Sequence, residues 1–406
     1  MKWEKVKLGD IATFSNGINF NKTAYAKGIK LIGVSNFGDR FYPDYSQLQE
    51  VKKDIVRLED CLRNGDIVFV RSNGNKELVG RCMLVKNPTE RVTYSGFCIR
   101  ARLNDTDRYD PVYFTYYFKS KAFRRAVSGT AVGANIQNLS QARLSNHECR
   151  IPSIEVQHRI ADILSVYDDL IENNQKQIKL LEEAAQRLYK EWFVNLRFPG
   201  HENTKIVDGV PEGWRVASIA DICDTVGGGT PSTKIQSYYE RGDILWVTPT
   251  DITRNFSLAL LDTEKKITPE GLKNSSAKML PAETILMTSR ASVGFFGMCK
   301  YEVCTNQGFI SCIPKRENLQ MYLLFNLKSR VEEIRQKAGG STYLEISKTV
   351  FRELKIILPK DEVLAEYQKN VHDIFDEIYC RTEMIKSLVD MRNRVLPKLM
   401  SGEVEV

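Results

Sequence analysis

Two stretches of the chain repeat apolar side chains at alternating spacings of four and three residues, the heptad pattern of paired long helices. The first series runs from Ile160 to Trp192 and the second from Val371 to Leu399. The positions expected to pair the helices are Ile160, Leu164, Tyr167, Ile171, Ile178, Leu181, Leu188, Val371, Phe375, Ile378, Ile385, Leu396 and Leu399. Polar residues on the same series, Asn174, Thr382 and Arg392, predict contacts that set the register. The alternative interpretation is an ordinary amphipathic helix packed on its own domain.

The chain also repeats itself at an offset of about 211 residues, close to half its length. The order of matching positions is kept throughout, with small drifts in the offset. Matching pairs are Trp3 with Trp214, Gly17 with Gly228, Gly65–Phe69 with Glu283–Met287, Val79–Gly80 with Val293–Gly294, Gly96–Phe97 with Gly308–Phe309, Glu155–Gln157 with Glu366–Gln368, and Ile160–Ile163 with Val371–Ile374. The period is too long for a solenoid, so the pattern indicates a duplicated domain.

Each copy begins with a part rich in Gly, aromatic residues and short apolar runs, which predict strands such as 67–70 and 81–85. Residues 112–127 and 319–337 predict helices between them. The expected organisation is a globular domain at 1–152, a long helix at 153–197, a Pro- and Gly-punctuated connector at 198–212, a second globular domain at 213–358 and a second long helix at 359–406. The fold class is therefore α+β, with two similar globular α/β domains.

Composition narrows the class of protein without choosing a function. The chain has 406 residues, 42% apolar and 27% charged, which suits two to four folded domains and excludes low-complexity disorder. No apolar run approaches the roughly 18 residues of a membrane span, and the charged start predicts no secretory signal. The nine Cys residues include no C-x-x-C pair, so we expect reduced thiols in a cytosolic protein. The net charge of +7 is compatible with a polyanionic partner but does not require one.

Catalytic and cofactor motifs are sparse in the sequence. The four His residues, His147, His158, His201 and His372, are not spaced from one another as a metal pair, and no second pair completes a zinc set with Cys299 and Cys304. The sequence contains no nucleophile elbow, phosphate-binding loop, dinucleotide fingerprint or Asp/Asn-Pro-Pro-Tyr/Phe tetrapeptide. The run at 227–234 resembles a phosphate cradle, but its Pro and its spacing favour a glycine-rich turn. We therefore expect neither a catalytic residue nor a metal ligand in this chain.

One short pattern favours an enzyme. Asp44, Glu50 and Lys52 follow the P-D…E-x-K order of many metal-dependent nucleases, in which two carboxylates hold the ion. The pattern is degenerate and has no equivalent at the matching place in the second copy. A solvated loop is the simpler interpretation, and a nuclease stays open as an alternative.

Polar and basic residues follow matching strands in both copies and are candidates for contacts with DNA. Arg can make paired hydrogen bonds to guanine, Asn to adenine, and Ser or Thr to a base or a phosphate. The candidates are Arg71, Ser72, Asn73, Asn75, Lys76 and Arg81 in the first copy, and Thr288, Ser289, Arg290 and Ser292 in the second. Taken singly, such residues are those of a solvated loop, but their recurrence in both copies favours a role in binding.

Several motifs together resemble the specificity subunit of a Type I restriction–modification enzyme. They are the Trp and Asp-Ile at the start of each copy, Gly-Gly-Thr-Pro-Ser at 228–232, Trp-Val-Thr-Pro-Thr-Asp-Ile at 246–252, the Pro-x4-Gln at the start of each long helix, Phe-Pro-Gly at 198–200, Val-Pro-Glu-Gly-Trp at 210–214 and Leu-Pro-Lys-Leu-Met-Ser-Gly at 396–402. The resemblance covers nearly the whole chain. The first copy departs from it at 15–19, where Ser-Asn-Gly-Ile-Asn replaces the Gly-Gly-Thr-Pro element.

The resemblance implies two target recognition domains, each reading one half of an asymmetric, bipartite double-stranded DNA target, and an antiparallel helix pair that sets the unread spacer between the halves. It also implies two modification subunits and a restriction subunit as partners. S-adenosylmethionine, ATP and Mg²⁺ would belong to those partners, and this chain would itself be non-catalytic. The alternatives left open are a DNA-reading adaptor of a related phage-defence system, a scaffold that joins two proteins without reading DNA, and the nuclease.

Overall fold

The computed structural model describes residues 3–38, 40–73, 78–128, 138–340 and 343–406. It forms two compact units, and unit 1 joins segments from both ends of the sequence. Unit 1 comprises Met1–Ile171 and Leu388–Val406, and unit 2 comprises Glu172–Ser387. Each long helix therefore belongs partly to one unit and partly to the other, whereas the sequence pattern alone set the helices apart as separate segments.

The described residues of unit 1 form three small sheets. The largest has the strand order β2–β8–β5–β6 with antiparallel neighbours, and the second has the order β4–β3–β7, in which β3 and β7 run parallel. Strands β1 and β9 form an antiparallel pair. The strands are β1 (Glu4–Lys7), β2 (Ala12–Asn16), β3 (Tyr25–Ile32), β4 (Gln49–Val51), β5 (Ile67–Val70), β6 (Cys82–Leu84), β7 (Val92–Tyr94), β8 (Cys98–Leu103) and β9 (Glu148–Ile151).

The strands of unit 2 repeat this arrangement in the same order. Its sheets are β13–β19–β16–β17, β15–β14–β18 and β12–β20, again with one parallel pair, β14 with β18. The strands are β12 (Arg215–Ser218), β13 (Cys223–Val226), β14 (Ile244–Val247), β15 (Lys266–Ile267), β16 (Ile285–Thr288), β17 (Phe296–Gly297), β18 (Cys304–Thr305), β19 (Phe309–Pro314) and β20 (Lys355–Leu358). The α+β fold and the internal duplication predicted from the sequence are thus confirmed. A short hairpin of β10 (Ile206–Val207) and β11 (Val210–Pro211) lies in the connector.

The helices expected inside the globular parts are each interrupted. The predicted helix at 112–127 is two helices, because Ser120 adopts an extended conformation, and the predicted helix at 319–337 breaks at Arg330. The shorter helices are α1 (Leu8–Ile11), α2 (Pro111–Lys119), α3 (Lys121–Ser128), α4 (Gln141–Ser145), α6 (Ile219–Ile222), α7 (Pro249–Arg254), α8 (Pro269–Lys273), α9 (Gln320–Ser329), α10 (Val331–Gln336) and α11 (Lys348–Arg352).

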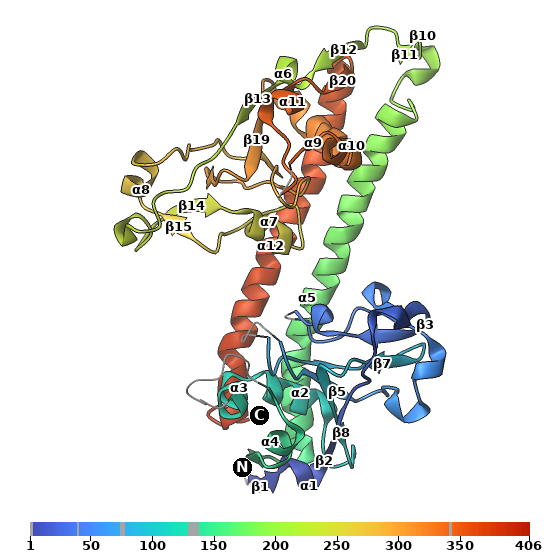
Figure 1. Cartoon of the computed structure of the whole chain (residues 1–406), viewed down its shortest axis with the longest axis vertical. Coiled ribbons are helices and arrows are strands. Elements are labelled where there is room, and N and C mark those ends of the chain that lie inside the picture. The colour runs from blue at the N-terminus through green and yellow to red at the C-terminus, as the bar shows by residue number, and fades with distance from the viewer. Residues whose placement is uncertain (1–2, 39, 74–77, 129–137, 341–342) are drawn as a thin grey trace. The chain divides into compact units, whose positions relative to one another are not determined.

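Two long helices run side by side within each unit (Figure 1). They are α5 (Ile154–Tyr189), which continues into a π-helical turn at Lys190–Val194, and α12 (Asp361–Ser401). In unit 2, Asn174 of α5 accepts a hydrogen bond from Arg381 of α12 (3.1 Å), and the ring of Tyr189 contacts that of Tyr367. Since the residue numbers rise along α5 as they fall along α12, the two segments are antiparallel.

The apolar residues at the heptad positions of these helices are buried or half-buried, as their periodicity predicts. In unit 1, Ile160, Leu164, Leu396 and Leu399 also share a core with sheet residues such as Phe69. The apolar heptad positions therefore pack on the globular part as well as on the neighbouring helix. Paired helices and an amphipathic helix packed on its own domain, the two interpretations of the heptad pattern, are thus both correct in part. Of the three predicted register residues, Asn174 and Arg392 bond across to the other helix, whereas Thr382 bonds to Ser257 of the globular part (3.2 Å).

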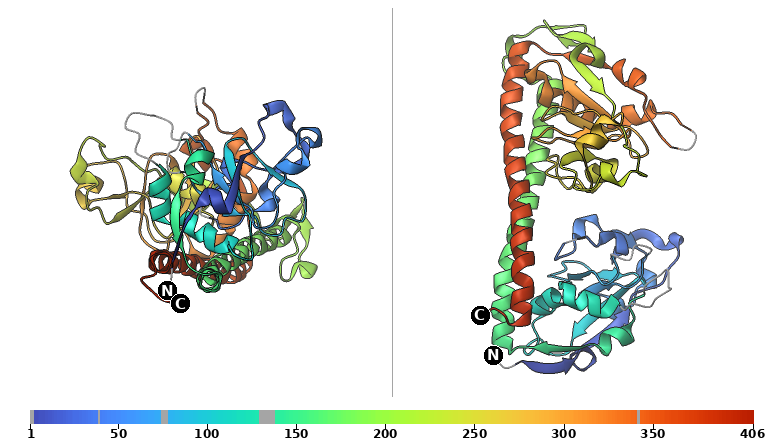
Figure 2. Two further views of the ribbon diagram at one scale, coloured as in Figure 1. Left: turned by 90° about the horizontal axis from the view of Figure 1, so that it is seen from below. Right: turned by 90° about the vertical axis from the view of Figure 1, so that its left-hand side faces the viewer.

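Both ends of the chain lie in unit 1 (Figure 2). The ring of Trp3 packs 3.1 Å from the place that a Cβ on Gly402 would occupy. Of the helices in the part of the chain that the structure describes, none combines the length and apolar character that crossing a membrane requires.

Candidate nucleic-acid interface

In unit 1, several loops meet where strand β5 ends. The N–H of Arg71 donates to the carbonyl of Phe97 (2.8 Å), and the carbonyl of Arg71 accepts from the N–H of Leu139 (2.9 Å). The N–H of Ile18 donates to the carbonyl of Tyr94 (2.9 Å). The loops that follow β2 and β5, the turn that precedes β8 and the segment at 138–139 are thereby held together by the backbone.

The same hydrogen bonds recur in unit 2 at the end of β16. The N–H of Ser289 donates to the carbonyl of Gly308 (2.8 Å), and the carbonyl of Ser289 accepts from the N–H of Ile346 (3.0 Å). The N–H of Gly229 donates to the carbonyl of Thr305 (2.9 Å). Position 71 therefore corresponds to position 289, and position 72 to position 290. The candidate residues of the two copies lie at equivalent places in the fold, even though their side chains differ.

Matching glycines allow the loops to approach so closely. A Cβ on Gly17 would lie 2.2 Å from the carbonyl oxygen of Tyr94, and one on Gly228 would lie 2.1 Å from that of Thr305. No side chain fits at these distances. The glycine run at 227–229 thus packs one loop against another, which agrees with its interpretation as a glycine-rich turn.

The first-copy candidates lie along the β5 loop with their side chains half-buried where the structure describes them. One guanidinium nitrogen of Arg71 donates to the carbonyl of Gly96 (3.2 Å), and Ser72 forms a backbone bridge with Asn138. Asn73 and Arg81 also have interaction partners. The predicted residues Asn75 and Lys76 lie outside the described residues.

The second-copy candidates divide into two buried and two exposed side chains. Thr288 and Ser289 are buried, and the hydroxyl of Thr288 donates to the carbonyl of Ser292 and accepts from the N–H of Phe295 (3.0 Å). These two side chains are buried rather than on the surface where the sequence placed them, because both faces of β16 are covered up to its end. Arg290 and Ser292 are exposed, and Arg290 faces Glu345 at 3.7 Å.

Exposed aromatic residues at these loops were not among the sequence candidates. Phe97, whose carbonyl accepts from Arg71, is 64% exposed, and Tyr343 in unit 2 is 60% exposed. Tyr343 precedes Leu344, which accepts a hydrogen bond from Ala291 (2.8 Å). Apolar side chains in such places can contact the methyl group of thymine. In the sequence, Phe97 is indistinguishable from a core residue because it opens an apolar strand.

The nuclease pattern is explained by local structure. Asp44 caps a short turn by accepting from the N–H (3.1 Å) and the hydroxyl (2.6 Å) of Ser46, and it pairs with Arg40 (2.9 Å). These partners outweigh the opposing effect of burial, so the pKa of Asp44 is lowered. Glu50 instead accepts from the N–H of Gly28 (2.6 Å). The two carboxylates thus serve separate parts of the fold.

All nine cysteines are free, and Cys380 alone among them is exposed. Burial raises the pKa of Cys82 to about 11 and that of Cys304 to about 12, so these thiols stay protonated near neutral pH. Eight of the nine thiols are thus buried in the fold.

Comparison with known proteins identifies the family. The family described as "Type I restriction modification DNA specificity domain" matches residues 1–183 and 211–389, which together make up most of the chain. The chain belongs to this family. Each matched region contains one set of sheets and most of the long helix that follows it, so the specificity-domain family accounts for both copies of the duplication.

Curated relatives of the family agree with this assignment. The HindI specificity subunit of Haemophilus influenzae is 25% identical over 475 aligned positions, which cover 99% of both chains. The MjaIX specificity subunit of Methanocaldococcus jannaschii is 38% identical over 173 residues, covering 42% of this chain and 39% of that one. The crystal structure of a Type I S subunit from M. genitalium shares the fold with a TM-score of 0.57 at 17% identity, covering 98% of this chain and 96% of that one.

Proposed function

We propose that this chain is the DNA-reading subunit of a Type I restriction–modification complex and that its two globular parts each read one half of a bipartite target. The observation that carries the proposal is the matched pair of loop clusters at the ends of β5 and β16, held by equivalent backbone hydrogen bonds. At equivalent positions the first copy has Arg-Ser (71–72) and the second has Ser-Arg (289–290). Because the side chains differ on a shared scaffold, the two half-sites would differ and the target would be asymmetric.

The long helices would set the unread spacer. With 36 and 41 residues, α5 and α12 span roughly 54 and 62 Å at 1.5 Å per residue. Half-sites one turn of DNA apart are separated by about 34 Å, which helices of this length can bridge.

The chemistry would reside in the partner subunits. The HindI relative is named a specificity subunit of a Type I restriction enzyme. By that likeness, this chain would position two modification subunits and the restriction subunits without a catalytic residue of its own. S-adenosylmethionine, ATP and Mg²⁺ would be bound by those partners. A methylated adenine must leave the base stack, so the specificity subunit would place the methyltransferase rather than touch the reacting atom.

The direct test is single-molecule sequencing of DNA from cells that express this chain with its modification partner, compared with cells that lack the chain. We expect a split motif with a constant gap and a methylated adenine in each half. Unchanged methylation with an assembled complex would contradict the proposal. A binding assay with randomised double-stranded DNA would then separate the alternatives. Enrichment of one DNA sequence would favour the adaptor of a phage-defence system, and no enrichment would favour the scaffold.

Arg71→Ala and Arg290→Ala should each relax only one half of the motif. If each Arg reads a guanine, its loss costs about 1–3 kcal/mol of discrimination at that base, whereas loss of a phosphate contact weakens binding evenly across sequences. Methylation patterns from the two variants provide the comparison, each variant serving as the control for the other. Relaxation of the same half by both variants would contradict the assignment of one half-site to each copy.

A further inference from the structure

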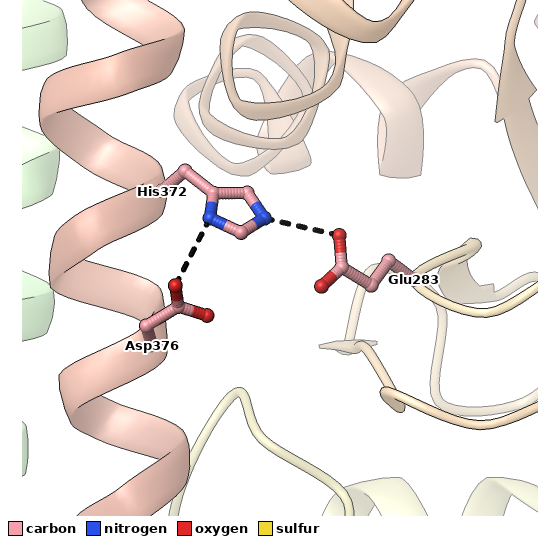
Figure 3. Close-up of side chains that lie close together, drawn as sticks. All are labelled: Glu283, His372 and Asp376. Atoms are coloured by element: carbon pink, nitrogen blue, oxygen red, sulfur yellow. Dashed lines mark hydrogen bonds and ion pairs between the residues drawn. The ribbon is translucent and has the colours of Figure 1, made fainter.

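Three side chains able to bind a metal ion meet in unit 2 beside α12 (Figure 3). His372 and Asp376 lie one turn apart on the helix, and Glu283 comes from the turn before β16. The Nε2 of His372 lies 3.1 Å from Oε2 of Glu283, and its Nδ1 lies 3.3 Å from Oδ2 of Asp376. Within the described ranges, no other group of three or more His, Cys, Asp or Glu side chains has its donor atoms within 4.8 Å of one another.

An imidazole between two carboxylates has an excess of acceptors around it. A neutral imidazole has one N–H and can donate to only one of the carboxylates. Lys300, with Nζ 2.6 Å from Oδ1 of Asp376, balances one of the two negative charges. A metal ion bound to one of the imidazole nitrogens would give the carboxylates a further partner.

The first copy shows that the fold does not need this cluster. The internal repeat places Gly65 opposite Glu283, Ala161 opposite His372 and Ser165 opposite Asp376, so all three metal-ligating side chains are missing there together. The strand and helix that carry these positions are nevertheless kept. The shared strand and helix therefore form without these three side chains.

Glu283 also adopts a backbone conformation that does not suit it. Its φ is +60°, in the left-handed region, where Gly65 of the first copy has φ of +87°. Glutamate is disfavoured there relative to glycine. Its backbone is fixed by a hydrogen bond from its N–H to the carbonyl of Cys299 (2.6 Å) and by one that its carbonyl accepts from Gln320 (2.7 Å). The turn thus holds the carboxylate toward α12.

We propose that Glu283, His372 and Asp376 form a binding site for a divalent transition-metal cation of the zinc type. One imidazole and two carboxylates are ligands that Zn²⁺ accepts, and three protein ligands leave a coordination position for water. Mg²⁺ and Ca²⁺ prefer oxygen ligands alone, so the histidine selects against them. In a tetrahedral zinc site the donor atoms lie about 3.4 Å apart. The donor atoms of the three residues lie within 4.8 Å of one another. To complete a tetrahedral site, the half-exposed side chain of Asp376 would rotate toward the imidazole nitrogen that faces Glu283.

A metal here would fasten the recognition part of unit 2 to its long helix. Glu283 directly precedes β16, and the carboxyl end of that strand leads to Arg290. The bound ion would add a cross-link between the base of that strand and α12, a stabilisation that the first copy lacks. This inference concerns metal binding and does not depend on the proposed reading of DNA.

The test is metal binding by the full-length chain, purified without a polyhistidine tag and stripped with a chelator. We expect isothermal titration to show one Zn²⁺ per chain with micromolar or tighter affinity, and Co²⁺ to give the visible bands of a tetrahedral site. Mg²⁺ at the same concentrations should produce no heat of binding. Zinc should also raise the unfolding temperature of the wild type.

Two variants each introduce the residue that the first copy has at the matching position, because the shared fold accepts that residue there. Glu283→Gly introduces the residue that suits a positive φ, and Asp376→Ser introduces the residue of Ser165; each should weaken zinc binding at least tenfold. Glu377→Gln removes a neighbouring carboxylate on the same helix, one that pairs with Arg381 (2.6 Å), and should leave binding unchanged. Cys380→Ser should do the same, which separates this site from binding by the exposed thiol.

Two results would overturn the proposal. Zinc binding that survives both Glu283→Gly and Asp376→Ser would place the ion elsewhere in the chain. A folded wild-type chain that binds no zinc would show that the three side chains interact only with one another and with Lys300.

Discussion

Replacing Asp168 by alanine is expected to lower the free energy of unfolding of unit 1 by about 3–5 kcal/mol, the usual cost of removing one partner from a buried ion pair. The side chain of Asp168 is 6% exposed. Its carboxylate pairs with Arg392 of α12, whose side chain is 13% exposed, and accepts a hydrogen bond from the hydroxyl of Tyr116 in α2 (2.6 Å). One carboxylate thus satisfies groups from two other helices.

The loss would be large because the partners of Asp168 have little access to water. Burial, reinforced by the neighbouring carboxylate, raises the pKa of Tyr116, so its hydroxyl remains a hydrogen-bond donor across the ordinary pH range. In Asp168→Ala the phenol of Tyr116 would lose its acceptor, and the guanidinium of Arg392 would lose its carboxylate partner and keep its hydrogen bond to the side-chain oxygen of Asn393 (3.3 Å). An uncompensated buried charge is the main part of the expected cost.

Denaturant unfolding of the full chain, combined with hydrogen exchange of α2 and the end of α12, measures this effect. Asp169→Ala is the matched control, since Asp169 is the exposed neighbour on the same helix. In the double variant Asp168→Ala/Arg392→Met, much of the stability should return because no buried charge is left unpaired. Equal unfolding midpoints for Asp168→Ala and Asp169→Ala would contradict the prediction.

The role of Asp168 was not visible in the sequence, although the helix that carries it was. Heptad spacing is a local signal, and it placed Ile160, Leu164, Leu396 and Leu399 correctly on an apolar face. A charged residue beside such a series looks like part of the solvated face. Its partners lie 52 and 224 positions away, so only the folded chain shows that the carboxylate is buried.

The duplication was the strongest sequence signal for the fold. Matching glycines and apolar strands predicted two copies of one domain, and the two sets of sheets have the same strand order. The heptad spacing of the apolar residues in α12 could not show that the last part of this helix completes the core of unit 1. The periodicity says which face of a helix is apolar, but it does not say what covers that face.

The candidate site was predictable to the level of the loop but not of the side chain. The strands before Arg71 and Ser289 were recognisable, and so was their equivalence. That Thr288 and Ser289 are buried depends on where β16 ends and on what covers its two faces, and element ends are poorly fixed by pattern. The Glu283 cluster was missed because Glu283 is 89 positions from His372; the available signal was the four-residue spacing of His372 and Asp376 on one predicted helix.

A second large effect is expected at Tyr367 of α12, which is fully buried among aromatic rings in unit 2. Its ring lies 4.8 Å from that of Phe193, 5.7 Å from that of Trp192 and 6.4 Å from that of Tyr189. Tyr367→Ala should lower the free energy of unfolding of unit 2 by about 3–5 kcal/mol, as for other buried aromatic residues, because it leaves a cavity that these rings cannot fill.

Tyr367→Phe should have the opposite sign, which makes it the informative control. The hydroxyl of Tyr367 is buried and has no hydrogen-bond partner among the residues that the structure describes, and burial raises its pKa. An unsatisfied buried hydroxyl costs about 1–3 kcal/mol, so its removal should stabilise unit 2 by about 1 kcal/mol while the ring packing is retained. Denaturant unfolding of the full chain and hydrogen exchange of α9 and α12 would measure both variants. If Tyr367→Phe were as destabilising as Tyr367→Ala, the hydroxyl would have a partner in solution, and the stability of this cluster would depend on that bond rather than on the packing of its rings.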